Sequence, residues 1–446
     1  MEVTRSKSMS INALLSMLLI GACTLNKPLP TTYESQVDLI IVGAGIAGLT
    51  AAKQMQEAKK SFLVLEAQDR IGGRTIVNKD FLIPIDLGAA WFHGVEDNPL
   101  VQIADKMGFK RVDTNLSGPI YIANRKASKL ETDACEKIYE QLEKAMDKQI
   151  ESGRDVPISA LLPKDKKCAD LVASNIGPFE NGAEIEKVSS IAAGLFETGN
   201  DDFIKEGLGT FVESFGKNVP VRLNSIVNKI EYGPSGVRVS LMSGEKFFAR
   251  RVLVTVSTGV LASGTIYFDP PLPNWKQEAI KKLPMGLLNK VVLQFKKDIF
   301  EDTPKNSWVL WDGPGNDNVA FVIRPFDTPI AVAFYGGEQA KNFEQDDAAA
   351  IDHAKRVLEK MYGSKVEIEL EKSALTKWGK NPWSLGAYSY VTPGASTTHN
   401  TLLKPVDERL FFSGEACSSP KHNGTVHGAY ESSIRASKLF LRSLAE

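Results

Sequence analysis

The chain has 446 residues, of which 24% are charged and 43% are hydrophobic, and its formal net charge is −1. This length allows two or three domains with a substantial hydrophobic core. Basic and acidic residues are balanced and no long basic run occurs, so the sequence gives no support for nucleic-acid binding. The composition indicates an ordinary globular protein.

The N-terminal segment differs from the rest of the chain. Arg5 and Lys7 precede an apolar stretch over 11–20, which Gly21, Ala22 and Cys23 follow. The stretch is too short to span a bilayer comfortably. Basic residues before it and small residues after it are the arrangement of a signal peptide. It resembles a bacterial lipoprotein signal. We therefore predict a signal peptide over 1–23, a linker over 24–36 and an exported protein, periplasmic or held at the outer membrane by lipid on Cys23. The alternative is an uncleaved N-terminus on a cytoplasmic protein.

A glycine-rich turn follows the first predicted strand. The apolar run 39–42 predicts a buried parallel strand. In the Gly43, Gly45 and Gly48 spacing, the first glycine permits a tight turn, the second brings backbone close to a pyrophosphate, and the third lets the next helix pack on the sheet. About twenty residues further on, Glu66 ends the second predicted strand, where it can accept hydrogen bonds from ribose hydroxyls. The pattern predicts a dinucleotide site, and Glu66 argues against a 2′-phosphate.

The remaining chain alternates helical and strand patterns. Residues 96–215 are mostly helical in pattern, with helices expected over 135–150 and 183–196. Later helices are expected over 346–361 and from about 425 to the C-terminus. The strands expected are 219–222, 226–232, 237–241, 252–256, 290–295, 308–311, 319–323, 330–335, 366–370 and 409–415. These elements predict one α/β domain, with a helical insert and a mixed-sheet insert forming another.

Cysteines and histidines give no metal signal. Apart from Cys23 the cysteines are Cys135, Cys168 and Cys417, an odd number without short spacing, which does not suggest a disulfide framework or a metal site. The histidines, at 93, 353, 399, 422 and 427, show no ligand-pair spacing. We predict no metal.

Five separated blocks over about residues 36–446 resemble the flavin-containing amine oxidases, which include monoamine oxidases, polyamine oxidases, lysine-specific histone demethylases and bacterial nicotine-type amine oxidases. The segments 86–94, 386–390 and 412–429 are most similar to polyamine oxidases and demethylases. The resemblance implies an α/β fold of two domains. The discontinuous FAD-binding domain would comprise 37–112, 206–283 and 400–446, and the substrate-binding domain 113–205 and 284–399.

The same resemblance implies that FAD is the cofactor. Ala387 stands where monoamine oxidases carry the cysteine that bonds the flavin, so the FAD is expected to be non-covalent. Arg74 is expected at a phosphate or the flavin edge, and Val227 at the adenine edge through its main chain. The residues expected to bind FAD are Gly43, Gly45, Ile46, Ala47, Gly48, Glu66, Ala67, Arg74, Val227, Gly414, Glu415, Thr425 and Val426.

The residues implied to be catalytic are Lys290, Trp378, Tyr388 and His93. Lys290 is placed where the family holds a water against flavin N5, and a lysine in an apolar strand is costly unless it is functional or reaches water. Trp378 would pack on the flavin and Tyr388 would face it. Thr425 replaces the second tyrosine of monoamine oxidases, which favours a wider pocket. His93 would accept a hydrogen bond or proton from the amine; a structural loop histidine is the alternative.

The resemblance implies oxidation of a small-molecule primary or secondary amine, with a polyamine favoured, by hydride transfer to flavin N5. Reoxidation by O2 would give hydrogen peroxide, with another electron acceptor as the alternative, and the imine would be hydrolysed. An L-amino-acid oxidase is one alternative and would need an arginine to bind a carboxylate, for which Arg111, Arg125 and Arg324 are candidates. An amine dehydrogenase that passes electrons to a carrier is a second. A catalytically silent flavin-binding module is a third.

Overall fold

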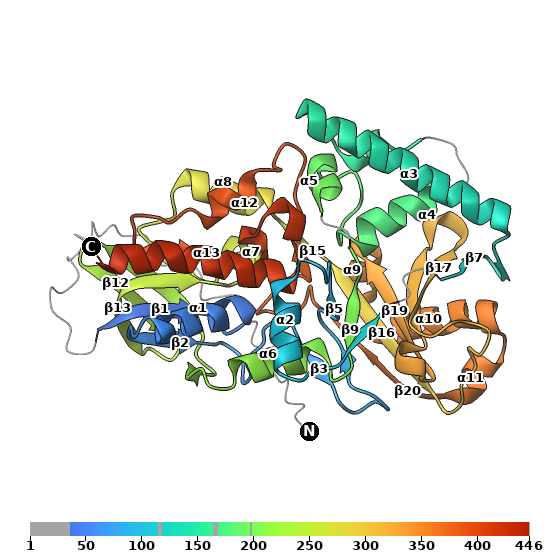
Figure 1. The fold of residues 1–446 in the computed structure, drawn as a ribbon, viewed down its shortest axis with the longest axis horizontal. Helices are drawn as coiled ribbons and strands as arrows, with labels where there is room; N and C mark the ends of the chain where they lie inside the picture. Colours follow the sequence, from blue (N-terminus) through green and yellow to red (C-terminus); the bar gives the residue numbers. More distant parts are fainter. Residues whose placement is uncertain (1–35, 115–117, 164–167, 197–198, 446) are drawn as a thin grey trace, which may run out of the picture.

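The computed structural model describes residues 36–114, 118–163, 168–196 and 199–445. The predicted signal peptide, Cys23 and all but the last residue of the linker lie outside the described residues. Figure 1 shows two halves side by side, one built around β1, β13 and α13 and the other around β16, β19 and α10.

The first half is built on an eight-stranded sheet in the order β10-β2-β1-β13-β12-β11-β14, with β22 also paired to β13. The strands β10, β2, β1, β13 and β22 are parallel to one another, whereas β12 is antiparallel to β11 and β13. Its strands are β1 (Val37–Val42), β2 (Phe62–Leu65), β10 (Val221–Arg222), β11 (Val227–Gly233), β12 (Gly236–Leu241), β13 (Lys246–Val254), β14 (Tyr267–Asp269) and β22 (Leu410–Phe412).

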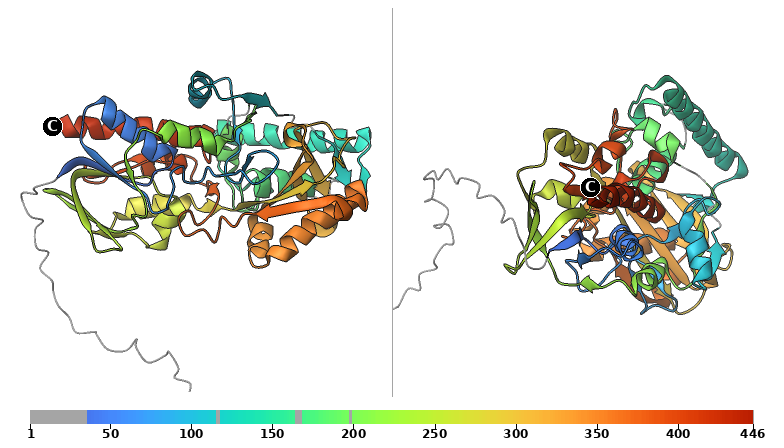
Figure 2. Two further views of the ribbon diagram at one scale, coloured as in Figure 1. Left: turned by 90° about the horizontal axis from the view of Figure 1, so that it is seen from below. Right: turned by 60° about the vertical axis from the view of Figure 1, so that its left-hand side comes forward.

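Both faces of this sheet are buried, which explains the continuous apolar run of β1. Leu39 and Ile41 pack into one core cluster while Ile40 and Val42 pack into another on the opposite face. The first face is covered by α1 (Ile46–Glu57), α2 (Pro99–Lys106), α6 (Leu208–Gly216) and α13 (Val426–Ala445), and the second by α7 (Thr258–Ser263), α8 (Asn274–Lys282) and α12 (Thr398–Leu403). Figure 2 shows α1 and α13, from opposite ends of the chain, lying together.

The second half contains a seven-stranded sheet in the order β20-β16-β19-β18-β17-β7-β8. All neighbours are antiparallel except β17 and β7. The strands are β7 (Ile120–Ile122), β8 (Arg125–Lys126), β16 (Leu288–Phe295), β17 (Ser307–Asp312), β18 (Val319–Ile323), β19 (Ile330–Gly336) and β20 (Leu370–Leu375). Alternate residues of β16 face α10 (Asp347–Tyr362), and the others, including Val292, face the opposite side.

The helices over the second half form an outer layer, in which the long α3 (Lys129–Ser152) lies across α4 (Ala169–Ser174) (Figure 1). A π-helical turn, η2 (Asn175–Phe179), continues α4. The other helices are α5 (Ser190–Leu195), α9 (Gly337–Phe343) and α11 (Lys365–Glu369), and the short strands are β3 (Val77–Asn78), β4 (Ile85–Asp86), β5 (Trp91–Phe92), β6 (Arg111–Asp113), β9 (Asp202–Ile204), β15 (Met285–Gly286) and β21 (Tyr388–Ser389).

Two secondary-structure predictions are wrong. The segment 366–370 was expected as a strand because its apolar residues alternate, but residues 365–369 form α11 and the strand β20 begins only at Leu370. Val366 is buried and Ile368 is 69% exposed, so the alternation does not mark one buried face. The helix expected over 183–196 is confined to α5, where Ser189 accepts a hydrogen bond from the Ala192 amide and so starts the helix only at 190.

The expectation that the cysteines form no disulfide is also wrong. Cys135 on α3 and Cys168, directly before α4, are joined across 33 residues of sequence with a Cα–Cα distance of 5.2 Å. Among the described residues, Cys417 is the free cysteine, and it is buried. Spacing alone gave no signal because the two residues meet only when the helices pack on each other.

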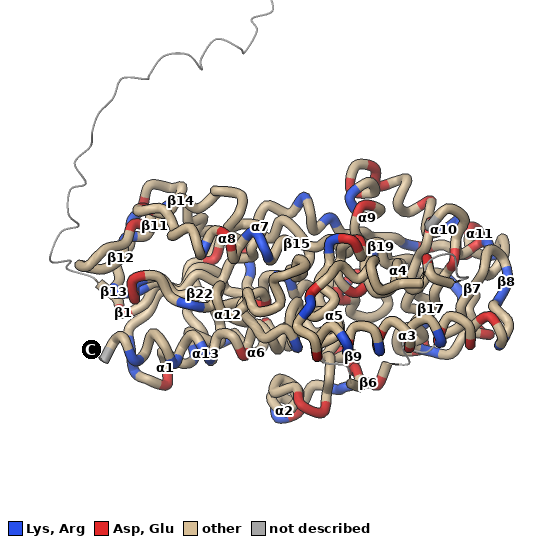
Figure 3. Tube along the Cα trace, turned by 90° about the horizontal axis from the view of Figure 1, so that it is seen from above, with Lys and Arg blue, Asp and Glu red and all other residues tan. Residues whose placement is uncertain are grey.

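The α/β character and the mixed sheets of the prediction are confirmed. The domain boundaries remain a prediction. Charges of both signs are interspersed along the described trace, as Figure 3 shows, in keeping with the balanced composition.

Candidate active site

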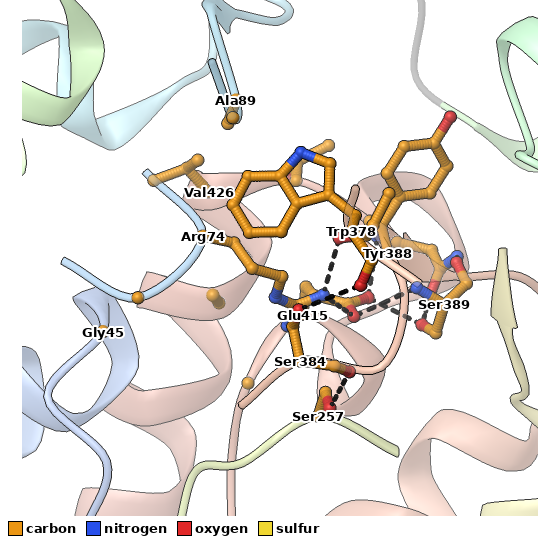
Figure 4. Close-up of a pocket in the computed structure, with 18 of the residues that line it drawn as sticks. Gly45, Arg74, Ala89, Ser257, Trp378, Ser384, Tyr388, Ser389, Glu415 and Val426 are labelled. Carbon is orange, nitrogen blue, oxygen red and sulfur yellow. Dashed lines mark hydrogen bonds and ion pairs between the residues drawn. The ribbon is translucent and has the colours of Figure 1, made fainter. Parts of the chain in front are cut away.

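A cavity of about 840 Å³ lies where the two halves meet. Its wall includes all of the predicted catalytic residues and all of the predicted cofactor residues except Gly48. Figure 4 shows that Trp378, Tyr388, Arg74 and Glu415 come close together at this wall. The structure therefore brings residues from the beginning, middle and end of the chain into one chamber.

The glycine-rich turn has the geometry that its sequence predicts. Gly43 adopts a positive φ of 105°, and a Cβ there would lie 2.5 Å from Thr255 Oγ1. Gly48 lies beneath the turn, where a Cβ would approach the Gly43 carbonyl oxygen to 1.9 Å. Its role is thus to let α1 pack against the strand. The carboxylate of Glu66 accepts hydrogen bonds from the backbone amides of Ala44 (2.7 Å) and Gln68 (3.0 Å), which holds it at the end of β2.

Glu415 is a buried carboxylate that joins three distant segments. It accepts hydrogen bonds from Arg74 Nη1 (2.8 Å), from Ser389 Oγ (2.6 Å) and the Ser389 amide (3.1 Å), and from the Gly424 amide (3.2 Å). The same Arg74 nitrogen also donates to the carbonyl oxygen of Ala387 at 3.0 Å. The guanidinium is 26% exposed and remains at the cavity wall. These bonds fix one end of the chamber.

These residues fit FAD. Gly45 and Gly73 lie so close that a Cβ on Gly73 would be 3.3 Å from the Gly45 Cα, which leaves bare backbone at the cavity wall. Glu66 stands at the end of β2, where it could accept hydrogen bonds from a ribose, and the guanidinium of Arg74, paired with Glu415, lies at the wall. Helix α13 directs its N-terminal end at the cavity through Val426, and this end of a helix carries partial positive charge that favours an anionic group. No cysteine lies on the described part of the wall.

Lys290 lies on β16 and is 5% exposed. Its ammonium donates to the carbonyl oxygens of Asp86 (2.8 Å) and Gly88 (2.7 Å), and it lies 5.6 Å from the Trp91 ring centroid. Burial lowers the pKa of Lys290, and the nearby Asp86 carboxylate opposes this shift. The side chain therefore points across the cavity wall and does not reach bulk solvent along the outside of the sheet.

The two predicted aromatic residues are fixed by backbone contacts. Trp378 donates from Nε1 to the Leu87 carbonyl oxygen at 3.3 Å, and Tyr388 donates from its hydroxyl to the Phe179 carbonyl oxygen at 3.2 Å. Opposite the Tyr388 ring stands Gly424, where a Cβ would make contact at 3.4 Å. Burial raises the pKa of Tyr388, so its phenol stays neutral. Thr425 follows Gly424 and supplies no second ring, as expected.

His93 lies at the cavity wall and is held by a residue that the sequence did not single out. Its Nδ1 lies 2.8 Å from Asp201 Oδ2, and the imidazole is 35% exposed. His427 is buried behind the wall, where its Nδ1 lies 3.2 Å from Asn98 Nδ2. Burial lowers the pKa of His427 to about 3, which keeps it neutral.

A further set of polar residues on α3 and η2 was missed by the sequence reasoning. We call this set the acidic wall; it comprises Tyr139, Glu143, Asp147, Asn175 and Glu180. Glu180 accepts hydrogen bonds from the Tyr139 hydroxyl (3.1 Å) and from Asn175 Nδ2 (2.8 Å). The signal was the spacing of Tyr139, Glu143 and Asp147, which fall four residues apart on one face of a helix.

Glu180 is the member of the acidic wall whose charge acts on Tyr388, and its residue is exposed in the cavity. Desolvation by the surrounding protein, with the repulsion of Glu143, raises the pKa of its carboxyl to about 7. Its charge also interacts with His93. The cavity therefore carries negative charge that extends from its opening towards the aromatic residues.

None of the three arginines proposed to bind a carboxylate lines the described cavity wall. Arg111 pairs with Asp105 and Asp202, and Arg125 pairs with Glu131. Arg324 pairs with Asp298 and Asp327. Two further aromatic residues lie near these elements: Trp383 lies at the cavity wall, whereas Tyr390 is buried in the core beneath α3 and α4.

Comparison with known proteins gives one consistent family. The model of the family described as "Flavin containing amine oxidoreductase" matches residues 46–171 and 175–440. Polyamine oxidase 2 of Arabidopsis thaliana is 30% identical over 433 residues, which cover 90% of this chain and 87% of that protein. Lysine-specific histone demethylase 1 homolog 3 of the same plant is also 30% identical, and the match covers 91% of this chain but 30% of that protein.

Solved structures agree on the fold. Putrescine oxidase bound to putrescine superimposes with a TM-score of 0.77 at 19% identity, covering 92% of this chain and 99% of that one. A double mutant of putrescine oxidase gives the same score at 20% identity. With a family match over most of the chain and a cavity that fits FAD, this protein belongs to the flavin-containing amine oxidoreductases and uses FAD as its cofactor.

Proposed function

We propose that this enzyme oxidises a diamine or polyamine at a carbon next to nitrogen. The observation that carries the proposal is the acidic wall, which lies in the same cavity as Lys290, Trp378 and Tyr388. Polyamines are flexible chains with several ammonium groups at neutral pH, and carboxylates bind such groups by charge-assisted hydrogen bonds. A monoamine would leave this negative charge without a partner.

The two ends of the cavity have different roles, one in binding the charged part of the substrate and the other in positioning the reacting nitrogen. Glu143, Asp147 and Glu180 attract and hold the charged distal part of the substrate, which steers it in from the opening. At the inner end Tyr388 and Trp378 present ring faces in a confined space, where the reacting nitrogen is desolvated and its neutral form is favoured. His93, fixed by Asp201, stands ready to accept a hydrogen bond or proton from that nitrogen.

When bound, FAD would supply the hydride acceptor, and O2 would take up the two electrons with formation of hydrogen peroxide. Hydrolysis of the imine product would give a carbonyl compound and an amine or ammonia. Gly43, Glu66 and Arg74 would hold the cofactor, with the N-terminal end of α13 at the same cavity wall through Val426. Lys290 places a positive charge inside the cavity. In this desolvated site the charge stabilises an anionic group, or orients a water, more strongly than it would in bulk solvent. An electron carrier in place of O2 is the second candidate acceptor.

The amino-acid oxidase alternative is less well supported, because the candidate arginines pair with acids away from the described wall. A carboxylate substrate would also face Glu180 and Glu143 without a matching cation. A catalytically silent flavin-binding module would not require a buried lysine beside two fixed aromatic residues.

We also propose that the protein is exported. The signal-like N-terminus motivates this proposal, and the disulfide between Cys135 and Cys168 supports it, since disulfides persist in oxidising compartments. Cell fractionation tests it with the full chain and a Cys23→Ser variant. We expect the full chain in the membrane fraction with incorporated fatty acid, and the variant without the label. Recovery of the unlabelled full chain in the cytoplasm would reject export.

The proposed substrate class is tested by anaerobic mixing of the holoenzyme with spermidine, putrescine, phenylethylamine and leucine. We expect bleaching of the flavin absorbance by spermidine or putrescine at micromolar to millimolar concentrations, and weak or no bleaching by leucine. Bleaching by leucine alone would favour the amino-acid oxidase. Bleaching by none of the four amines would favour the silent module.

Lys290→Met removes the buried charge but keeps the length of the side chain. We expect FAD to stay bound and turnover or flavin reoxidation to slow by about tenfold or more, because a preorganised charge in a desolvated site contributes strongly to catalysis. Stopped-flow spectroscopy separates the two steps. The control is Lys296→Met, at an exposed position beyond the same strand. Unchanged reduction and reoxidation rates would remove Lys290 from the mechanism.

Glu180→Gln tests the acidic wall. Above the wild-type pKa of about 7, we expect kcat/KM for spermidine to fall about tenfold and that for phenylethylamine to change little, since one charge-assisted bond is lost. In the wild type, binding of the distal ammonium requires the ionised carboxylate, so kcat/KM should fall more steeply for spermidine than for phenylethylamine as the pH drops below about 7, and this difference should vanish in the variant.

The control for Glu180→Gln is Glu186→Gln, an exposed acid nearby that does not line the cavity. Equal losses for both amines, or an unchanged value for spermidine, would contradict the role of the acidic wall.

A further inference from the structure

The disulfide joins the two elements that carry the acidic wall. Cys135 lies on α3, four residues before Tyr139 and eight before Glu143, so all three lie on one side of the helix. Cys168 directly precedes α4, which runs without a break into η2 and ends at Glu180. The disulfide and the Tyr139–Glu180 hydrogen bond therefore connect the same two elements. The disulfide lies outside the cavity, and the hydrogen bond lies at its wall.

Helix α3 is held along one side, where it packs on α4 and, through Met146 and Ile150, on Gly194 of α5. Of its 24 residues, only Cys135, Ile138, Leu142 and Met146 are buried. These pack with Leu171, Val172 and Ile176 of the α4–η2 segment in a small core cluster. Figure 1 shows α3 on the outer side of this half, with its long axis over α4. A helix attached along one narrow stripe depends more on a cross-link than a helix surrounded by protein.

The η2 side is held more firmly. A Cβ on Gly336 of β19 would lie 1.9 Å from the Pro178 carbonyl oxygen, so this turn packs directly on the second sheet. Phe179 is buried and its carbonyl oxygen accepts the Tyr388 hydrogen bond. The disulfide thus ties α3, which is buried along one stripe only, to a segment that is fixed to the aromatic end of the cavity.

We propose that the Cys135–Cys168 disulfide is a positioning element of the substrate site: it holds Tyr139, Glu143 and Asp147 at the distance from Glu180 that a chain with two or more ammonium groups requires. The inference rests on the proposed function. The disulfide touches neither the reacting carbon nor the cofactor, so its loss should change the binding of the charged distal part of the substrate and leave the chemical step alone.

The test compares wild-type holoenzyme with a Cys135→Ser/Cys168→Ser double variant, and with wild type reduced by a phosphine and alkylated. For both modified proteins we expect KM for spermidine to rise about three- to tenfold, because roughly one of the carboxylate contacts is weakened. We expect kcat, flavin content and KM for phenylethylamine to change less than about twofold. The phosphine should have no further effect on the double variant, which controls for its action elsewhere.

An unchanged KM for spermidine would overturn the proposal, as would an equal rise for both amines. If the double variant does not fold, the reduced wild type alone decides the outcome. If the wild type oxidises neither amine, the proposed function is contradicted. Hydrogen exchange then tests the positioning role of the disulfide separately. Exchange in α3 that accelerates on reduction while η2 stays protected supports the positioning role, and unchanged exchange in α3 overturns it.

Discussion

The buried carboxylate of Glu415 is the contact on which the site depends. A negative charge inside a protein is tolerated only when it is paired and hydrogen-bonded. Glu415 meets this need with Arg74 from the first part of the chain, Ser389 from the middle and Gly424 beside the last helix. Its pairing therefore requires all three segments to converge, and the chamber exists only where they do.

The chamber combines two opposite electrostatic environments. Lys290 and the N-terminal end of α13 supply positive potential at the inner end, where a bound flavin would accumulate negative charge, whereas the charge of Arg74 is paired with Glu415. The acidic wall supplies negative potential towards the opening. Tyr388 and Trp378 lie between them and are neutral. This order suits a substrate that must be cationic to be recognised and neutral at one nitrogen to react.

Local patterns predicted the cofactor half well because the constraints there are local. Gly43, Gly48 and Glu66 follow from strand, turn and helix geometry within one βαβ unit. The resemblance supplied Lys290 and Tyr388, which the structure brings to the same wall. Glu180, Asp201 and the Cys135–Cys168 pair were missed because their partners are distant in sequence and are set by helix packing. The false strand at 366–370 shows that a short apolar alternation does not distinguish a strand from one helical turn.

The central claim is that one cavity holds the flavin and a chain with several positive charges at the same time. The most direct measurement is a crystal structure of the flavin-reduced holoenzyme soaked anaerobically with spermidine. The account predicts one amine nitrogen between Tyr388 and His93, and a second nitrogen within hydrogen-bonding distance of Glu180 or Glu143. A polyamine bound outside this cavity, or one whose distal nitrogen lies away from the acidic wall, would contradict it.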